Sequence, residues 1–273
     1  MPLVHSPQAP VPIPPDVLML AYRSGIFPMA DSRDDPEVFW VEPRSRAILP
    51  LDGFHCSRSL ARTLRRGHFT VTCNTAFAQV MEQCAAPRTA MGSNADDSGE
   101  SWISRRIFAS YVALHQLGHA HSIECWRDGK LVGGLYGVGF DRVFCGESMF
   151  SRESDASKVA LAWLVAALRR CGAELLDCQF ITPHLASLGT VEVSQEQYVG
   201  LLKAAQRPYS LGAALGAGAG AALGSGVGDA AGAAFAAGAP LSLPEGFAAL
   251  VAAAGGSSSS PGNFIAQSLT QTS

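Results

Sequence analysis

Two acids and one amide lie in short, otherwise apolar segments near the middle of the chain. Glu147 follows an apolar run that starts at Val143, and Asp177 and Gln179 alternate with apolar residues in the segment 175–181. An acid inside an expected strand is costly to bury unless it is paired or has a function. Carboxylates at such positions can serve as general acids or bases. These residues are therefore candidates for a functional site, and a purely structural pair of carboxylates is the alternative.

Four strands and one helix are expected to position these groups. Apolar and alternating residues predict strands over 121–126, 130–140 and 142–149. The dipeptide Asp128-Gly129 favours a tight hairpin between the first two, so the three strands should form an antiparallel meander.

A helix should connect this meander to the strand 175–181. Asp155 or Ser157 is expected to cap it, and it should run to Arg170. Strand alternation places Asp177 and Gln179 on one face, with Leu176 and Cys178 on the other. A meander, a crossover helix and a returning strand predict an α+β fold of the acyltransferase kind.

A row of arginines is the second candidate site. A helix capped by Ser57 or Ser59 should end at Gly67. Its basic residues recur at helical spacing and share one face: Arg58, Arg62, Arg65 and Arg66. Guanidinium groups bind phosphates in a bidentate manner, and no acid lies between Gly53 and Phe77. The row is a candidate phosphate contact, and a solvated helix face is the alternative.

Other chemistries have weaker support. The sequence has neither a P-loop nor a dinucleotide fingerprint. His119 and His121 form an H-x-H pair without a third ligand at suitable spacing, so no metal site is expected. The segment 146–148 lacks the second glycine of a nucleophile elbow. Seven cysteines without a C-x-x-C pair indicate reduced thiols rather than a disulfide framework.

The ends of the chain differ in composition from its centre. The 273 residues carry a net charge of −3, so nucleic acid could be bound only through a local patch. Residues 1–15 are Pro-rich and are expected to be a disordered leader without signal-peptide character, which indicates a cytoplasmic protein. Residues 208–261 are rich in Gly, Ala and Ser and are expected to form a low-complexity linker, with one weak helix over 243–254. Residues 262–273 should form a C-terminal arm, and no segment predicts a membrane span.

Several strings together resemble the bacterial leucyl/phenylalanyl-tRNA–protein transferase family. They follow the family's order across roughly residues 16 to 200, and F-C-G-E-S-M-F-S-R from Phe144 is the most specific. The others are A-Y-R-S-G-I-F-P-M from Ala21, S-W-I from Ser101, G-H-A-H-S-I-E from Gly118, G-G-L-Y-G from Gly133, A-S-K from Ala156, D-C-Q from Asp177 and H-L-A-S-L-G from His184.

The resemblance implies a fold and an activity. A small N-terminal α/β domain over 16–56 would join an acetyltransferase-like (GNAT) domain over 57–207. The activity would move Leu, and less readily Phe or Met, from aminoacyl-tRNA to the α-amine of proteins that begin with Arg or Lys. That transfer marks the protein for degradation by the N-end rule. Because the ester to tRNA is already activated, no cofactor is expected.

The resemblance also implies roles for single residues. Asp177 and Gln179 match the pair that makes the acceptor amine nucleophilic, and Glu147 matches the acid that holds the aminoacyl amino group. Trp40 and Trp102 match aromatics that stack on the terminal adenosine of the tRNA, although on composition alone Trp40 is more often a core residue. The pocket for the aminoacyl side chain would comprise Leu135, Phe144, Met149, Leu161, Leu164, Leu168 and Leu176.

Two alternatives remain open, together with three departures from the family. An acyl-CoA-dependent acetyltransferase would need glycines before the crossover helix, and residues 152–157 contain none. A non-catalytic tRNA-binding module would use only the arginines and tryptophans. The loop 89–100 is longer than usual in the family, the Gly/Ala stretch has the character of an insertion, and several pocket positions carry Leu.

Overall fold

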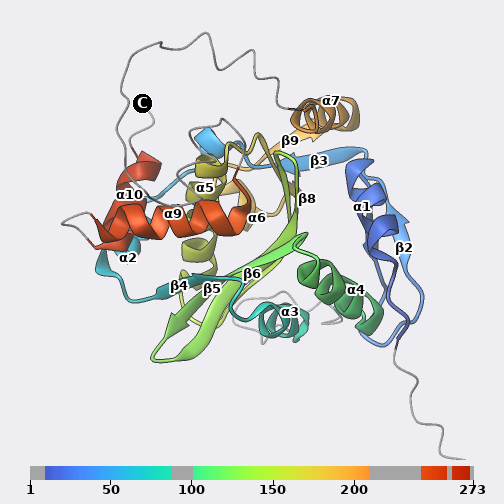
Figure 1. The fold of residues 1–273 in the computed structure, drawn as a ribbon, viewed down its shortest axis with the longest axis horizontal. Coiled ribbons are helices and arrows are strands. Elements are labelled where there is room, and N and C mark those ends of the chain that lie inside the picture. The colour runs from blue at the N-terminus through green and yellow to red at the C-terminus, as the bar shows by residue number, and fades with distance from the viewer. Residues whose placement is uncertain (1–9, 88–100, 209–240, 257–259, 271–273) are drawn as a thin grey trace, which may run out of the picture.

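A seven-stranded mixed sheet runs through the molecule, and a two-stranded sheet lies beside it (Figure 1). The structure is a computed structural model that describes residues 10–87, 101–208, 241–256 and 260–270. The large sheet has the order β4-β5-β6-β7-β8-β3-β9, and β1 pairs with β2. The strands are β1 (Phe27–Met29), β2 (Phe39–Val41), β3 (Ser45–Ile48), β4 (Thr70–Cys73), β5 (Ala120–Arg127), β6 (Lys130–Phe140), β7 (Val143–Ser151), β8 (Leu175–Gln179) and β9 (Val191–Ser194).

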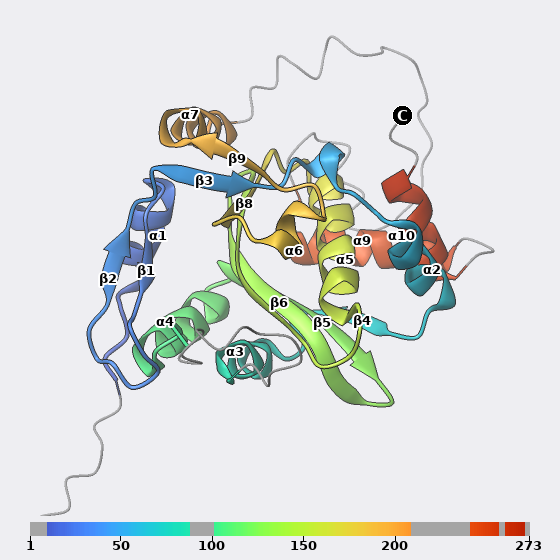
Figure 2. The ribbon, with the colours of Figure 1, turned by 180° about the vertical axis from the view of Figure 1, so that it is seen from behind.

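Helices cover both faces of this sheet (Figures 1 and 2). One apolar cluster joins a face of the sheet to α2, α5, α9 and α10. A second cluster joins the opposite face to α1, α3, α4 and α7. The bounds are α1 (Pro15–Arg23), α2 (Arg58–Arg66), α3 (Phe77–Ala85), α4 (Arg105–Gln116), α5 (Ala156–Cys171), α6 (Pro183–Ala186), α7 (Gln195–Ala205), α9 (Leu243–Gly255) and α10 (Pro261–Thr270), with a 3-10 turn η1 (Leu51–Gly53).

The predicted meander and crossover are confirmed. Strands β5, β6 and β7 pair antiparallel in succession, α5 follows, and β8 returns parallel to β7. The hairpin turn has positive φ angles at Asp128 and Gly129, as the sequence pair predicted. The α+β class is therefore correct, and the sheet is mixed because β7 and β8 are parallel within an otherwise antiparallel arrangement.

Helix α5 begins where expected but is not capped by a side chain. Asp155 is the N-cap residue in a left-handed conformation (φ 65°), and it makes no side-chain capping hydrogen bond. Its carboxylate instead accepts from Lys158 Nζ at 2.9 Å. The predicted side-chain cap at Asp155 or Ser157 is therefore wrong, because the Asp155 carboxylate pairs with Lys158 and does not accept from a backbone N–H of the helix.

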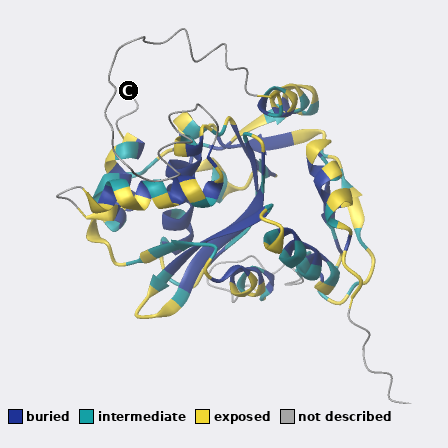
Figure 3. Ribbon diagram, viewed as in Figure 1, coloured by how far each residue is buried: buried dark blue, intermediate teal, exposed yellow. Residues whose placement is uncertain are grey.

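Helix α5 is buried on all sides. Thirteen of its sixteen residues are buried, so apolar cover is needed on the side that faces away from the sheet as well. Helix α9 supplies that cover (Figure 3). The Phe247 ring packs 5.5 Å from that of Trp163 between ring centres, and Leu250 belongs to the same apolar cluster.

The described end of the chain therefore differs from the expected linker. Residues 243–255 form a packed helix, whereas residues 209–240 of the expected linker and the loop 89–100 lie outside the described residues. Helix α10 docks on α2, and Arg169 Nη1 of α5 donates to Ser268 O at 3.0 Å. The helix expected over 243–254 is therefore confirmed, but it is packed in the core instead of belonging to a loose linker, because its few large apolar residues recur at helical spacing and cover α5.

The N-terminal boundaries also differ from expectation. Ile13, within the expected disordered leader, is buried, and its N–H donates to Ser110 Oγ at 2.8 Å. Strand β3, within the expected N-terminal domain, lies inside the large sheet between β8 and β9. A boundary at residue 56 would therefore cut between strands of one sheet. Within the described residues, no helix is both long enough and apolar enough to cross a membrane.

Replacing Gly262 with Ala should loosen the contact between α10 and α2. A Cβ at this position would overlap the backbone oxygen of Leu64, which cannot move without displacing α2. We expect a loss of about 1–3 kcal/mol in the free energy of unfolding, measured by urea denaturation. Gly200→Ala is the matched control, because Gly200 is exposed in α7 with open space around it, and it should gain about 0.5–1 kcal/mol. Equal effects of the two changes would contradict the tight contact.

Candidate active site

Strands β7 and β8 are paired only at their beginnings. The parallel register ends at Cys145 and Asp177, after which β7 continues to Ser151 while β8 ends at Gln179. Gln179 has a positive φ of 56°, which is uncommon outside glycine and ends the extended backbone two residues earlier than predicted. The polar side chains therefore lie where the two strands separate.

Glu147 is the extra residue of a β-bulge. On the other side of β7, Gly146 pairs with Gly137 and Ser148 pairs with Tyr136, which leaves Glu147 without a partner residue. Bulges redirect side chains and are frequent beside active sites. Here the Gln179 Nε2 donates to Glu147 Oε1 at 3.3 Å. The structure thus brings together two of the three predicted polar residues by direct contact.

Asp177 is fully buried, and both of its oxygens are hydrogen-bonded. Oδ1 accepts from Arg46 Nε and from the Gln179 backbone N–H, each at 2.9 Å. Oδ2 accepts from Arg46 Nη2 at 2.6 Å and from Tyr198 Oη at 3.0 Å. The alternation predicted for β8 is correct, because Asp177 faces one apolar cluster and Leu176 faces the other. Asp177 therefore holds Gln179 in position through its backbone.

Arg46 lies between two aromatic rings and is as buried as its partner. Its guanidinium carbon is 4.7 Å from the centre of the Phe27 ring and 4.5 Å from that of Tyr198, and Nη1 donates to Gly25 O at 3.1 Å. Burial opposes its charge, but the hydrogen bonds and charge of Asp177 outweigh burial and raise the pKa of Arg46. The pair is a fixed structural unit beneath Gln179.

The second oxygen of Glu147 is held by tyrosines from two helices. Tyr111 Oη of α4 donates to Oε2 at 3.2 Å, and Tyr111 is in turn hydrogen-bonded to Tyr22 of α1. Burial raises the pKa of Glu147 to about 7, the charge of Asp177 adds to the rise, and the tyrosine hydrogen bonds oppose it. Glu147 can therefore gain or lose a proton near neutral pH, as a group that handles an amine requires.

Tyr136 lies opposite the bulge and has an unused hydroxyl. Its ring packs edge-on against that of Tyr111, with ring centres 5.8 Å apart. Its Oη is buried and has no hydrogen-bond partner among the described residues. Burial and the charge of Glu147 raise the pKa of Tyr136, so the hydroxyl stays protonated and can donate to a bound substrate.

The seven residues expected to form the apolar pocket lie together around α5. Six are buried members of one cluster, and Met149 packs against it partly buried. They occupy the sheet face opposite Tyr111 and Tyr198.

The two tryptophans lie in different parts of the fold. Trp40 is on β2 and is 42% exposed, so the composition-based expectation of a core position is wrong. It is exposed because its three-residue strand pairs only with β1 at the edge of the molecule. Trp102 lies just before α4 and is partly buried against the apolar cluster of that helix. Within the described residues, no ring contact joins them.

The arginine row is on α2 as predicted. Ser57 caps this helix by accepting from Leu60 N–H, and Gly67 ends it in a left-handed conformation. All four arginines are exposed, and none pairs with an acid within the described residues. Helix α2, which carries them, lies beside α10 at the end of the molecule that is away from α1 and α4 (Figures 1 and 2).

Sequence reasoning missed Arg46 and the tyrosines Tyr22, Tyr111, Tyr136 and Tyr198. Arg46 carried a usable signal, because residues 46–50 also predict a strand and a charged residue there is as costly to bury as an acid. The tyrosines carried none, since a tyrosine among apolar residues of a helix or strand is an ordinary core residue.

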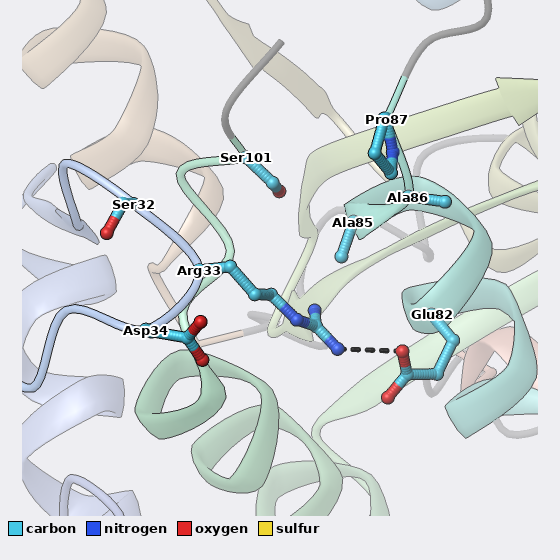
Figure 4. Close-up of a pocket in the computed structure, with 8 residues that line it drawn as sticks. All are labelled: Ser32, Arg33, Asp34, Glu82, Ala85, Ala86, Pro87 and Ser101. Atoms are coloured by element: carbon cyan, nitrogen blue, oxygen red, sulfur yellow. Dashed lines mark hydrogen bonds and ion pairs between the residues drawn. The ribbon is translucent and has the colours of Figure 1, made fainter.

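A separate cavity of about 430 Å³ lies between the loop at Arg33 and the end of α3 (Figure 4). Arg33 reaches across it to Glu82, with Nη2 and Oε2 2.7 Å apart. Its rim includes Pro87 and Ser101, which border the segment 88–100 outside the described residues. None of the predicted site residues lines this cavity, so it is distinct from the site at Glu147.

Comparison with known proteins identifies the family. The family model described as leucyl/phenylalanyl-tRNA protein transferase matches residues 48–203, and the model of that protein's N-terminal domain matches residues 12–44. The leucyl/phenylalanyl-tRNA–protein transferase of Novosphingobium aromaticivorans is 69% identical over 266 residues, which are 97% of this chain and 98% of that protein. The protein of the same name from Rhizorhabdus wittichii is 58% identical over 207 residues, 76% of this chain and 79% of its own length.

Solved structures are far less similar. The structure of L-PGS from Bacillus licheniformis is 13% identical with a TM-score of 0.32, and the match covers 63% of this chain and 55% of that one. A likeness of this strength assigns no fold family. The family-model matches cover the residues of the Glu147 and Asp177 clusters except Arg46, which lies in the short gap between the two matched segments. The chain therefore belongs to the leucyl/phenylalanyl-tRNA–protein transferase family of enzymes, which transfer aminoacyl groups from tRNA to protein N-termini.

Proposed function

We propose that this enzyme transfers Leu, and less readily Phe or Met, from aminoacyl-tRNA to the α-amine of proteins that begin with Arg or Lys. The product would be a substrate for N-end rule degradation. The observation that carries the proposal is the contact between Glu147 and Gln179 at the separation of β7 and β8. The same two strands carry Phe144, Met149 and Leu176 of the expected apolar site, so polar groups for two amines and part of a side-chain site come from the same strands.

The reaction forms one amide bond and breaks one ester bond. The acceptor nitrogen attacks the ester carbonyl, and the bond to the tRNA ribose oxygen then breaks. The amine loses a proton, and the released ribose hydroxyl gains one, so the reaction is balanced without another reactant. The ester is already activated, and the enzyme's contribution is to orient the two amines and to assist proton transfer.

The contacts support a division of roles. Glu147 holds the amino group of the aminoacyl residue, since its pKa of about 7 allows it to be ionised while the amine is bound. Gln179 orients the acceptor amine. Asp177 acts through Gln179, because its oxygens already accept four hydrogen bonds from protein groups.

The proposal also includes contacts between the enzyme and the tRNA. The exposed ring of Trp40 and the partly exposed Trp102 stack on the terminal adenosine, a contact worth about 1–3 kcal/mol per base. The exposed arginines of α2 bind backbone phosphates. The parallel crossover from β7 through α5 to β8 supports an acetyltransferase-like arrangement, and we propose residues 57–207 together with β3 as the catalytic unit.

Incubation with labelled Leu-tRNA and peptides tests the function. We expect label on peptides that begin with Arg or Lys and none on a matched peptide that begins with Ala or on an Arg peptide whose α-amine is acetylated. Absence of label from the Arg and Lys peptides would refute the proposal. Equal labelling of the Ala peptide would refute the acceptor preference but retain the transfer.

A further inference from the structure

The C-terminal extension, defined here as residues 241–256 and 260–270, lies beyond the residues that the family model matches. It is nevertheless part of the core. Leu243, Phe247 and Leu250 are buried in the same cluster as the apolar residues around α5. Cys171 Sγ at the end of α5 lies 3.4 Å from Ser242 O. The extension therefore contacts the helix that supplies three of the proposed pocket residues.

A cavity of about 170 Å³ lies between the start of the extension and the end of α5. Leu241, Ser242 and Leu243 form one side of it, and Leu168 and Cys171 form another. Phe144 lies on its sheet side. Phe144 and Leu168 both belong to the proposed aminoacyl pocket, so this cavity adjoins that pocket directly.

The position of Phe144 places the cavity at the far end of the pocket. Phe144 precedes Glu147 by three residues on β7, a span of about 10 Å in a strand. Its ring occupies space left by a glycine in β6, since a Cβ at Gly137 would overlap both that ring and the Cys145 carbonyl. A side chain whose amine is held at Glu147 and which extends along β7 would therefore approach Phe144, with the cavity behind it.

The polar residues around the cavity are already engaged. Arg142 pairs with Glu174 at 2.7 Å and donates to the carbonyls of Ala204 and Arg207, each at 2.8 Å. Asp141 pairs with Arg23. Burial lowers the pKa of His121 to about 4, and this neutral ring contacts Asn74 at 3.0 Å. The apolar part of the lining comes from Phe144, Leu168, Leu241 and Leu243, and because the charged side chains of the lining are paired, the cavity suits a hydrocarbon or aromatic group better than a charged ligand.

We propose that Leu241 and Leu243 form the far wall of the aminoacyl side-chain pocket and set the relative use of Leu and Phe. This inference rests on the proposed function and assigns a specificity role to residues outside the family model. An apolar pocket discriminates between hydrocarbon groups mainly by the space it leaves, so the wall that limits its depth decides how well the longer Phe is accepted.

The test compares kcat/KM for Phe-tRNA and Leu-tRNA in variants of this wall. Leu241→Ala and Leu243→Ala should raise the Phe:Leu ratio at least about threefold relative to wild type, and Leu241→Phe should lower it by a similar factor. The matched controls are Leu250→Ala and Leu269→Ala, which remove the same atoms from buried positions of the extension that do not line the cavity. Their ratios should stay at the wild-type value.

The outcomes separate this inference from the proposed function. Wild-type ratios in Leu241→Phe and in the folded alanine variants, with transfer still present, would overturn the inference alone. Equal changes in the control variants would also overturn it, since they would reflect general loosening of the core. Absence of transfer by the wild-type enzyme from either tRNA would instead refute the proposed function. Thermal denaturation of each variant shows whether it is folded, and Leu241→Phe decides the matter if the alanine variants unfold, because it removes no buried atoms.

Discussion

Arg46→Met is expected to lower the free energy of unfolding by about 3–5 kcal/mol. The substitution keeps much of the apolar volume between the rings of Phe27 and Tyr198 but removes the only cation that contacts Asp177 within the described residues. Asp177 would then be a fully buried carboxylate with two hydrogen bonds in place of four. Urea denaturation at pH 7 measures the loss.

Two further variants separate loss of the charge pair from loss of packing. Arg105→Met is the matched control, because Arg105 pairs with Asp34 at 2.6 Å on the surface, and its loss should cost at most about 1 kcal/mol. Adding Asp177→Asn to Arg46→Met should recover part of the lost stability, since no charge is then left buried. If Arg46→Met were no more harmful than Arg105→Met, the buried pair would not be a source of stability.

Loss of Arg46 should also lower transfer independently of stability. Asp177 Oδ1 accepts from both Arg46 Nε and the Gln179 N–H, so without Arg46 the carboxylate is less firmly held and positions Gln179 less well for its contact with Glu147. The effect on turnover should therefore persist at temperatures where Arg46→Met is still fully folded.

Local sequence signals predicted the central block well. Turn chemistry at Asp128 and Gly129, alternation in β8 and the caps of α2 depend on residues close together in the chain. Each such element agrees with the tertiary structure, so the meander, the crossover and the face of Asp177 were accessible from the sequence.

The partners of the polar residues were not accessible in the same way. Arg46 and Asp177 are 131 residues apart, and nothing near either residue indicates the other. Both were visible as charges in expected strands, but only the acid was interpreted as part of a site. The tyrosine contacts of Glu147 come from α1 and α4 and depend on how two helices pack on the sheet.

A weak helix over 243–254 was expected, but the packing of the C-terminal extension against α5 was missed for a different reason. Its Gly- and Ala-rich composition indicates disorder, yet buried residues recur through α9 at helical spacing from Leu243 to Ala254. The stronger signal lay in α5, whose apolar residues occupy every side of the helix. A helix of that kind requires a covering element, and the extension is the segment that provides it.

Glu147→Gln should reduce kcat/KM for Leu-tRNA about 10²- to 10³-fold, because a neutral amide cannot offset the charge of a bound amine. In the wild-type enzyme, kcat/KM should rise with pH with a midpoint near the Glu147 pKa of about 7, as the carboxylate becomes ionised. The acceptor amine titrates with a pKa of about 8 and contributes to both profiles. Dividing the wild-type pH profile of kcat/KM by that of Glu147→Gln removes this shared contribution and leaves the pH dependence that is due to Glu147.

Protonation of Glu147 should also affect stability, but the free energy of unfolding should fall with rising pH whereas activity rises. The folded pKa of Glu147 lies above the unfolded value of about 4.5, so between these values the folded state holds a proton that the unfolded state has lost. Relative to Glu147→Gln, the wild-type enzyme should therefore lose stability as the pH rises from about 4.5 to 7, by on the order of 1–3 kcal/mol. Glu153→Gln is the matched control, since that carboxylate pairs with Arg127 near the surface, and it should alter neither profile. Parallel stability curves for wild type and Glu147→Gln would mean that Glu147 is ionised throughout this range, and the rise of activity near pH 7 would then have to come from the amines alone.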